Sequence, residues 1–215
     1  MSALSFAVTG ARPDPSALAP TLWVDLGISG PPDQRVQSIL LRCQIRIEPE
    51  LRRYDDDEQA RLLDVFGEPH RWSDTLNPFL LTHVTVPVRG FTGGTEMQMP
   101  VELSYDLEVA AGKYLHALRH GEVPLLFLFS GTVWLQGPAG LSIEQIPWDR
   151  EARYELPVAV WTELIDAHYP GTGWMRLHRD TIDALQAYKA RHMLPTFDDV
   201  VTRLLADAEI PEALT

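Results

Sequence analysis

Two histidines stand four residues apart in a segment with helical character, His116 and His120. On a helix over 110–120 this spacing places both imidazoles on one face, where they could bind a metal ion with His83 or Glu122 as a further ligand. No glutamate follows His116 directly, so the His-Glu-x-x-His motif of zinc proteases is absent. Imidazoles in the last turn of a helix also complement its dipole. The two histidines are therefore candidate metal ligands, with a purely structural role as the alternative.

Other reactive groups occur in patterns that indicate structure rather than chemistry. The acidic run Asp55–Glu58 resembles part of a calcium loop, but Ala60 and Phe66 replace the glycine and the bidentate glutamate of an EF-hand. That run predicts a helix cap instead. The single cysteine, Cys43, alternates with polar residues on an apolar row and is expected in the core. Gly-x-Ser-x-Gly, Gly-x-Gly-x-x-Gly and Walker A sequences are absent, and no cofactor is predicted.

Large aromatic side chains in loops are the stronger functional signal. Trp148, Tyr169 and Trp174 lie in or beside connections that contain proline and glycine, and Trp23 is out of phase with the apolar residues of its strand. Exposed aromatic side chains of this kind anchor protein partners. They can equally fill the seam between a sheet and its helices. These four residues are the candidate partner-binding positions.

Strict alternation of apolar and other residues from Met97 to Val109 predicts a half-buried strand. Its odd positions are expected in a core, while its even positions carry acids but no base, nucleophile or metal set. Further strands are predicted over 4–9, 22–28, 39–47, 79–89 and 141–146. The segment 124–135 begins with a run that is apolar on both faces, which predicts a central strand covered on both sides. Pro87 and Pro100 cannot donate a ladder hydrogen bond, so each predicts an edge strand or a bulge.

Helical periodicity marks two short segments among the strands and then dominates the C-terminal part. The short helices are expected over 55–67 and 110–120, and the later ones over 158–168, 180–193 and 197–208. Strands followed by helices predict an α+β fold, a mostly antiparallel β-sheet or β-sandwich with a helical C-terminal subdomain. We expect a β-rich domain over 1–156 and a helical subdomain over 157–215 that packs on it.

The charge composition narrows the class of partner. The 215-residue chain carries 30 acidic and 18 basic residues, a net charge of −12. This charge repels phosphate backbones and argues against nucleic-acid binding. The strongest apolar run, Val123 to Phe129, is far shorter than the roughly 20 residues that a membrane span needs. The N-terminus lacks a signal-peptide pattern, so a cytoplasmic location is expected.

Several sequence strings together carry a family resemblance. They are Leu41-Arg-Cys-Gln-Ile-Arg-Ile-Glu48, Arg53-Tyr54, Phe66-Gly67, Phe91-Thr-Gly-Gly-Thr95, Lys113-Tyr-Leu115, Pro124-Leu125, Phe129-Ser-Gly-Thr-Val133 and Ile146-Pro-Trp-Asp-Arg-Glu151. Over nearly its whole length the chain resembles a bacterial family catalogued as a domain of unknown function. Members of that family are often encoded beside genes for high-affinity nickel–iron hydrogenases, which implies an accessory role in assembling or organising such a complex. Acidic strands followed by helices are also similar in fold to the Sec-pathway export chaperone, which binds unfolded chains.

The expected function is that of a non-enzymatic accessory or chaperone-like factor that binds a protein partner, and the resemblance implies a hydrogenase subunit. Two alternatives stay open. One is a metal-binding protein or enzyme that uses His116 and His120. The other is a small-ligand binding domain with a pocket between the sheet and the C-terminal helices. The oligomeric state is also open, although a strand with an uncovered edge favours self-association.

Overall fold

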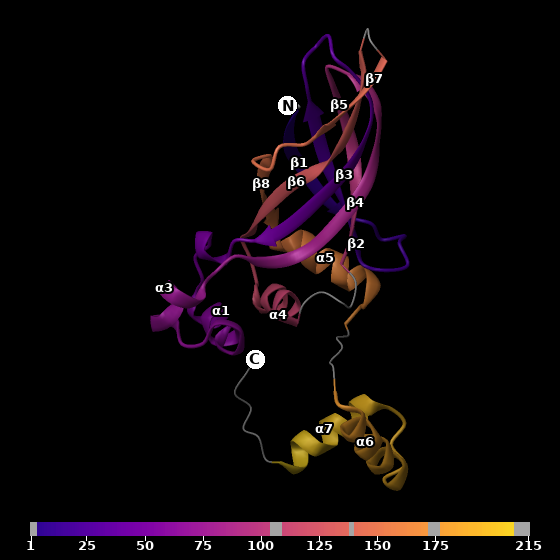
Figure 1. Ribbon diagram of the computed structural model, residues 1–215. Coiled ribbons are helices and arrows are strands. Elements are labelled where there is room, and N and C mark those ends of the chain that lie inside the picture. Colours follow the sequence, from indigo (N-terminus) through magenta and orange to yellow (C-terminus); the bar gives the residue numbers. More distant parts are fainter. Residues whose placement is uncertain (1–3, 104–108, 138–139, 172–176, 209–215) are drawn as a thin grey trace. The chain divides into compact units, whose positions relative to one another are not determined.

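The computed structural model describes residues 4–103, 109–137, 140–171 and 177–208 (Figure 1). The chain divides into two compact units, residues 1–171 and 172–215. The first unit contains every described strand, and the second contains two helices. Within the described ranges, no helix is both long and apolar enough to cross a membrane. The predicted α+β class with antiparallel sheets is confirmed.

Three antiparallel strands form one sheet in the order β1-β2-β5: β1 Ser5–Pro13, β2 Thr21–Ser29 and β5 Gly94–Glu102. The strict alternation that predicted β5 is confirmed through Glu102. The strand ends at Glu102, which pairs with Thr21, the first residue of β2, and the N–H of Leu103 then donates to the Pro20 carbonyl at 2.8 Å. The prediction of a strand at Val109 is wrong, since that residue begins helix α4, Val109–Ala117. Residues 104–108 lie outside the described part of the chain.

The other five strands form a second sheet: β3 Arg35–Ile47, β4 Phe79–Thr92, β6 Glu122–Gly137, β7 Gly140–Gln145 and β8 Glu151–Pro157. The order is β4-β3-β6, and the far side of β6 pairs with β7 along its C-terminal half and with β8 along its N-terminal half. Strand β8 was not predicted, although Ala152, Tyr154 and Leu156 alternate with Glu151, Arg153 and Glu155 in the pattern of a half-buried strand. One long strand thus supports two short ones.

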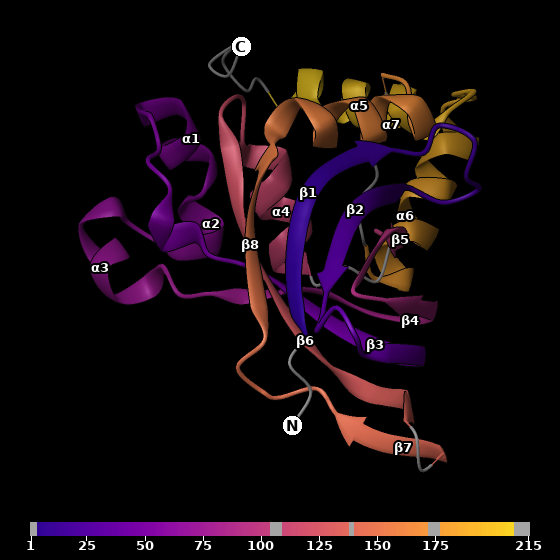
Figure 2. The same ribbon diagram turned by 90° about the horizontal axis from the view of Figure 1, so that it is seen from above.

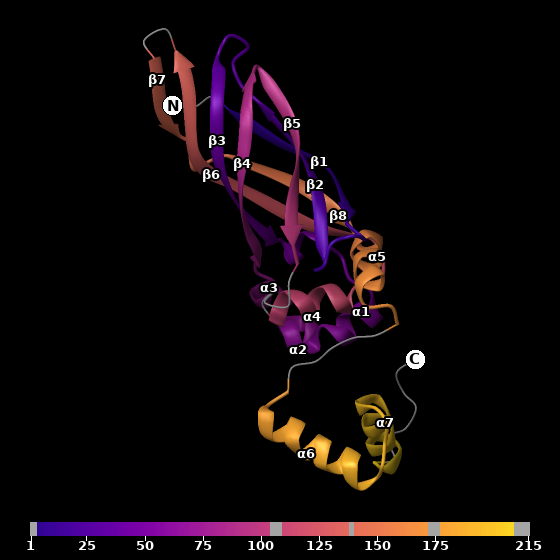
Figure 3. The same cartoon turned by 90° about the vertical axis from the view of Figure 1, so that its right-hand side faces the viewer.

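Prolines mark two sheet edges, as predicted. Pro87 lies on β4 and Pro100 on β5, and each of these strands is the last in the order of its sheet. These two strands are consecutive in the chain and lie side by side, as do β1 and β8 (Figure 3). Four strand edges are therefore arranged as two neighbouring pairs.

The inner faces of the two sheets share one hydrophobic core. Figure 2 shows β1 and β2 in one layer and β3, β4 and β6 in the other. Phe6 of β1 stacks on Phe129 of β6 with ring centroids 4.4 Å apart, so the layers are in direct contact. Cys43 on β3 is buried in this core, as its alternation predicted, and desolvation raises the pKa of its thiol to about 12.

Short helices follow β3: η1 Pro49–Leu51, α1 Asp56–Arg61, α2 Leu63–Phe66, η2 Pro69–Arg71 and α3 Trp72–Thr75. The helix predicted over 55–67 is present as α1 and α2, which end at Gly67 with a φ of 73°. The Asp55 carboxylate caps α1 by accepting a hydrogen bond from the Glu58 backbone N–H at 2.8 Å, so the capping role is confirmed. An aromatic cluster connects these helices to β4 and α4: Tyr54, Phe66, Trp72, Phe79 and Tyr114.

Helix α5, Val158–His168, belongs to the first unit although the sequence assigned it to the helical subdomain. It packs against β1 and β8 and buries Val158, Trp161 and Leu164. Because these side chains complete the core of the strands, the compact unit continues past the predicted boundary at 156 to residue 171.

The second unit consists of helices α6, Arg179–Arg191, and α7, Phe197–Asp207, close to the predicted ranges. Thr196 and Asp199 form a reciprocal capping box at the start of α7, in which the Thr196 hydroxyl accepts a hydrogen bond from the Asp199 N–H at 3.1 Å. Tyr188 on α6 and Asp207 on α7 connect the two helices through a side-chain contact of 3.5 Å.

Candidate protein-binding surface

Large apolar side chains are exposed on the outer face of the five-stranded sheet around β7. Leu141 and Ile143 on β7 are 58% and 63% exposed, and Leu40 on β3 is 39% exposed. Ile143 pairs with the half-buried Trp134 of β6, which places these two side chains on the same face. We call Leu40, Trp134, Leu141 and Ile143 the β7 surface. In Figure 3 the β6–β7 hairpin lies at the end of the unit opposite α1, α2 and α4.

Trp148 lies in the connection that follows β7 and is 93% exposed. Three backbone hydrogen bonds fix this connection. The N–H of Ile146 donates to the carbonyl of Gly131 at 2.9 Å, the N–H of Phe129 donates to that of Arg150 at 2.8 Å, and the N–H of Arg150 donates to that of Pro147 at 3.3 Å. The last bond closes a turn with Trp148 near its tip. A large aromatic side chain therefore projects into solvent from a backbone held against β6.

The other predicted partner-binding residues are in different surroundings. Trp23 is half-buried, and its indole N–H donates to the Asp14 carboxylate at 2.9 Å. Tyr169 follows α5 and is 36% exposed. Trp174 lies outside the described residues. Among the candidate residues that the structure describes, Trp148 is therefore the one whose side chain is almost fully exposed.

The two candidate metal ligands do not share a helical face. Helix α4 ends at Ala117, so the prediction of a helix through 120 is wrong and His120 follows the helix. The His116 ring packs edge-on against Trp161 with centroids 5.7 Å apart, and desolvation lowers its pKa. His120 lies 3.4 Å from the Asp55 carboxylate. In the described part of the chain no group of three or more His, Cys, Asp or Glu residues is placed to hold a metal ion.

The early end of α4 has a cause in a buried ion pair that the sequence did not indicate. The backbone N–H of Arg119 donates to the Glu58 carboxylate at 3.0 Å, and the His120 carbonyl accepts from the Arg52 guanidinium. Burial acts to raise the pKa of Glu58, but the hydrogen bonds from Arg52 and Arg119 outweigh it and hold the pKa below its usual value. These bonds replace those that a further helical turn would make. The pair joins three segments of the chain, because the Arg52 guanidinium also donates to the Glu122 carbonyl.

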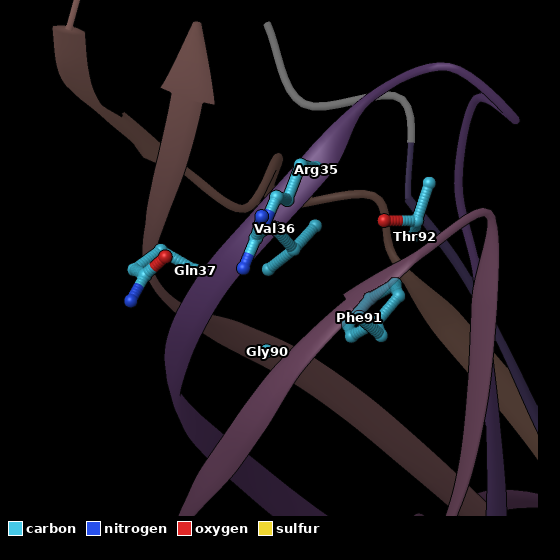
Figure 4. Close-up of a pocket in the computed structure, with 6 residues that line it drawn as sticks. All are labelled: Arg35, Val36, Gln37, Gly90, Phe91 and Thr92. Atoms are coloured by element: carbon cyan, nitrogen blue, oxygen red, sulfur yellow. The ribbon is translucent and has the colours of Figure 1, made fainter.

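A shallow cavity of about 310 Å³ lies between the ends of β3 and β4 (Figure 4). It is lined by Arg35, Val36, Gln37, Gly90, Phe91 and Thr92. The backbone shifts register against β6 between Val36 and Ser38, and a Cβ at Gly90 would lie 2.6 Å from the Gln37 carbonyl oxygen. The lining offers one guanidinium, one amide and one hydroxyl but no carboxylate, imidazole or thiol, so it holds no acid–base pair. This cavity is not where the sequence predicted a pocket, which was between the sheet and the C-terminal helices. Beneath α5 the space between helix and sheet is filled by Trp161 and its neighbours.

Sequence patterns do not single out Leu141 and Ile143, because an alternating apolar row looks the same whether or not another element covers it. The residue of this surface that the sequence identifies as a candidate is Trp148, in the Ile-Pro-Trp connection. Comparison with curated proteins and with solved structures found no match. A family model described as a family of unknown function, DUF6084, matches residues 1–213. The chain therefore belongs to the DUF6084 family.

Proposed function

We propose that this protein is a non-enzymatic accessory factor that binds a protein partner through Trp148 and the β7 surface. The observation that carries the proposal is the 93% exposure of Trp148 on an anchored turn that follows β7, the strand that carries the exposed Leu141 and Ile143. Exposed apolar clusters are uncommon on proteins that act alone and mark interaction sites. Tryptophan is also the residue most enriched at the energetic centre of interfaces.

The geometry favours association because little has to be reorganised on binding. The turn at 147–150 is held by backbone hydrogen bonds to β6, so docking does not have to order it. Burying one leucine or isoleucine side chain contributes about 1.5–3 kcal/mol. A partner that covers Leu141, Ile143 and Trp148 therefore gains affinity from side chains whose backbone is already in place.

Charge sets the expected character of the partner. The chain has a net charge of −12, whereas Leu40, Trp134, Leu141 and Ile143 are uncharged. A complementary protein offers an apolar strip with basic residues around it, because opposite potentials accelerate encounter and align the two surfaces. The family resemblance makes a subunit of a nickel–iron hydrogenase the first partner to test.

The test compares three variants in binding to purified hydrogenase subunits and in retention of proteins from an extract of the source organism. Trp148→Ala and Leu40→Ser change the proposed surface. Leu18→Ser is the matched control, because Leu18 is fully exposed in the loop between β1 and β2. We expect Trp148→Ala to weaken binding about tenfold or more and Leu18→Ser to leave it unchanged.

Circular dichroism and melting curves establish that all three variants fold. The proposal fails if the wild type retains no specific protein. It also fails if Trp148→Ala and Leu40→Ser bind each retained partner as tightly as Leu18→Ser does.

A further inference from the structure

Strand β7 lies at an edge of its sheet and differs from the other described edge strands, β1, β4, β5 and β8. The described edges other than β7 carry features that discourage pairing or lie next to another strand: Pro87 on β4, Pro100 on β5, and a bulge between Val8 and Gly10 on β1, with β8 beside β1. Strand β7, with the sequence Gly-Leu-Ser-Ile-Glu-Gln, has no proline, no lysine and no register shift. Natural sheets use such features to prevent edge-to-edge association, and β7 lacks them.

The backbone groups on the open side of β7 can be identified from its pairing with β6. The Ile146 N–H donates to the Gly131 carbonyl at 2.9 Å, in line with the register that pairs Gln145 with Thr132. In an antiparallel ladder alternate residues point their N–H and C=O groups toward the same neighbour. Ser142 and Glu144 therefore face β6, whereas Leu141, Ile143 and Gln145 direct their backbone groups to the open side.

We propose that a second copy of this chain pairs antiparallel with β7 across a two-fold axis, with Ile143 opposite Ile143 of the second copy. This register uses all three residues whose backbone groups face the open side, since Leu141 then lies opposite Gln145 of the second copy. The two five-stranded sheets become one continuous sheet, and Leu141, Ile143 and Trp134 of both copies form one apolar row on its outer face.

The same register is compatible with the charges of the strand. Ser142 lies opposite Glu144 of the second copy, so the two glutamates, the charged residues of the paired strands, do not oppose each other. A two-fold interface requires a self-complementary strand, and a six-residue segment with one charge near its end meets this requirement. This inference goes beyond the proposed function, because it concerns the chain without any partner.

The association has a characteristic salt dependence. Each copy has a net charge of −12, so two copies repel each other at low ionic strength. Added salt screens this repulsion while leaving hydrogen bonds and apolar contacts in place. We expect dimerisation to strengthen between about 0.05 M and about 0.5 M salt, whereas a basic partner strand on the same edge would bind more weakly as salt rises.

The first experiment is sedimentation velocity on the purified full chain from about 1 to about 100 μM. We expect a reversible dimer that Ile143→Lys weakens about tenfold or more, because two lysines then meet at the axis. Leu51→Lys is the matched control, since Leu51 is 58% exposed on η1 and Ile143 is 63% exposed. A monomer at every concentration, or a dimer equally stable in both variants, overturns the proposal.

The second experiment is disulfide cross-linking, which reports the register even if Ile143→Lys is poorly folded. Opposite residues in a hydrogen-bonded antiparallel pair have Cα atoms about 5.5 Å apart, within reach of a disulfide. The only native cysteine, Cys43, is buried. We expect Ile143→Cys to form a covalent dimer on mild oxidation and Leu51→Cys to remain monomeric. Preferential cross-linking of Ser142→Cys overturns the register with Ile143 at the axis.

Because no partner protein is present in either experiment, a failure to dimerise leaves the proposed function standing. The Trp148→Ala variant is expected to dimerise as the wild type does.

Discussion

The guanidinium of Arg52 and the carboxylate of Glu58 form a two-pronged ion pair, with N···O distances of 2.8 and 2.9 Å and side chains only 8% and 1% exposed. The same guanidinium donates to the Glu122 carbonyl at 2.9 Å and to the His120 carbonyl. One arginine thereby connects the segment before α1, the end of α4 and the start of β6. This cluster determines where α4 ends and therefore why His116 and His120 are not a helical pair.

Removing the charge of Glu58 is expected to be costly. Glu58→Gln leaves the Arg52 guanidinium buried without a counter-charge, which destabilises proteins by about 3–5 kcal/mol. Asp64→Asn is the control, because the Asp64–Lys113 pair is exposed and such pairs contribute about 0–1 kcal/mol. Urea unfolding of both variants at neutral pH measures the difference, and equal losses in the two would contradict the structural role of the Arg52–Glu58 pair.

The same pair predicts a pH dependence on the acidic side. The pKa of Glu58 in the folded protein lies below its usual value of 4.5. The stability from this group is therefore present above the pKa of the unfolded chain and is lost as the pH falls through the folded pKa. Unfolding free energies measured in acid should fall less steeply with decreasing pH for Glu58→Gln than for the wild type. If the unfolding free energies of the wild type and Glu58→Gln fall in parallel with decreasing pH, other carboxylates are responsible for the loss of stability in acid.

Gly131 is expected to tolerate no side chain. Its φ is 140°, and a Cβ there would lie 2.1 Å from the Leu40 carbonyl oxygen of the neighbouring strand. Gly131→Ala should lower the unfolding free energy by about 3 kcal/mol. Gly112→Ala in α4 is the matched substitution, because among the described residues nothing beyond its chain neighbours and its own helix backbone lies within 4 Å of its Cβ position, and it should raise stability by about 0.5–1 kcal/mol. The opposite signs are checked by thermal melting of the two variants side by side.

Cys43 is expected to be inert in the folded protein. Burial raises its pKa to about 12, so at pH 8 only about one thiol in ten thousand is ionised. Alkylation of Cys43 should therefore be limited by the rate at which the protein unfolds locally, and unfolding in guanidinium chloride should restore the alkylation rate of a free thiol. Rapid labelling of the native protein at pH 8, followed by mass spectrometry, would contradict the burial of Cys43.

Tyr54 and Tyr114 should ionise at a higher pH than a free tyrosine side chain. Their hydroxyl oxygens are 2.9 Å apart, and the Tyr54 hydroxyl donates to the Pro49 carbonyl at 2.8 Å. Burial raises the pKa of Tyr54 to about 12 and that of Tyr114 further. Stability from the neutral hydroxyls is thus present below pH 10 and is lost as the pH rises through the folded values. Ultraviolet titration should show tyrosine ionisation above pH 10 in the wild type, and Tyr114→Phe should lose one such group.

The elements that the sequence determined are those whose signal is local. Alternation placed β2 and β3, a run apolar on both faces placed β6, and Pro87 and Pro100 identified β4 and β5 as edges, because a proline has no N–H to donate to a second neighbouring strand. The period of the C-terminal part placed α5, α6 and α7 within a few residues. Strand β8 was missed although its residues alternate between charged and apolar, and its pairing with β6 identifies it as a strand.

The site depended on information that is not local. Trp148 and Trp23 are both candidate partner-binding residues by sequence, yet Trp148 is 93% exposed and Trp23 is half-buried and bonded to Asp14. The end of α4 depended on Arg52 and Glu58, more than fifty residues away in the chain. By itself the sequence determined which residues can line a strand or a helix, because that follows from backbone periodicity. Only the tertiary structure decided which of those rows is covered, because coverage depends on which distant segment packs against it, and this is why Leu41 is core while Leu141 and Ile143 face solvent.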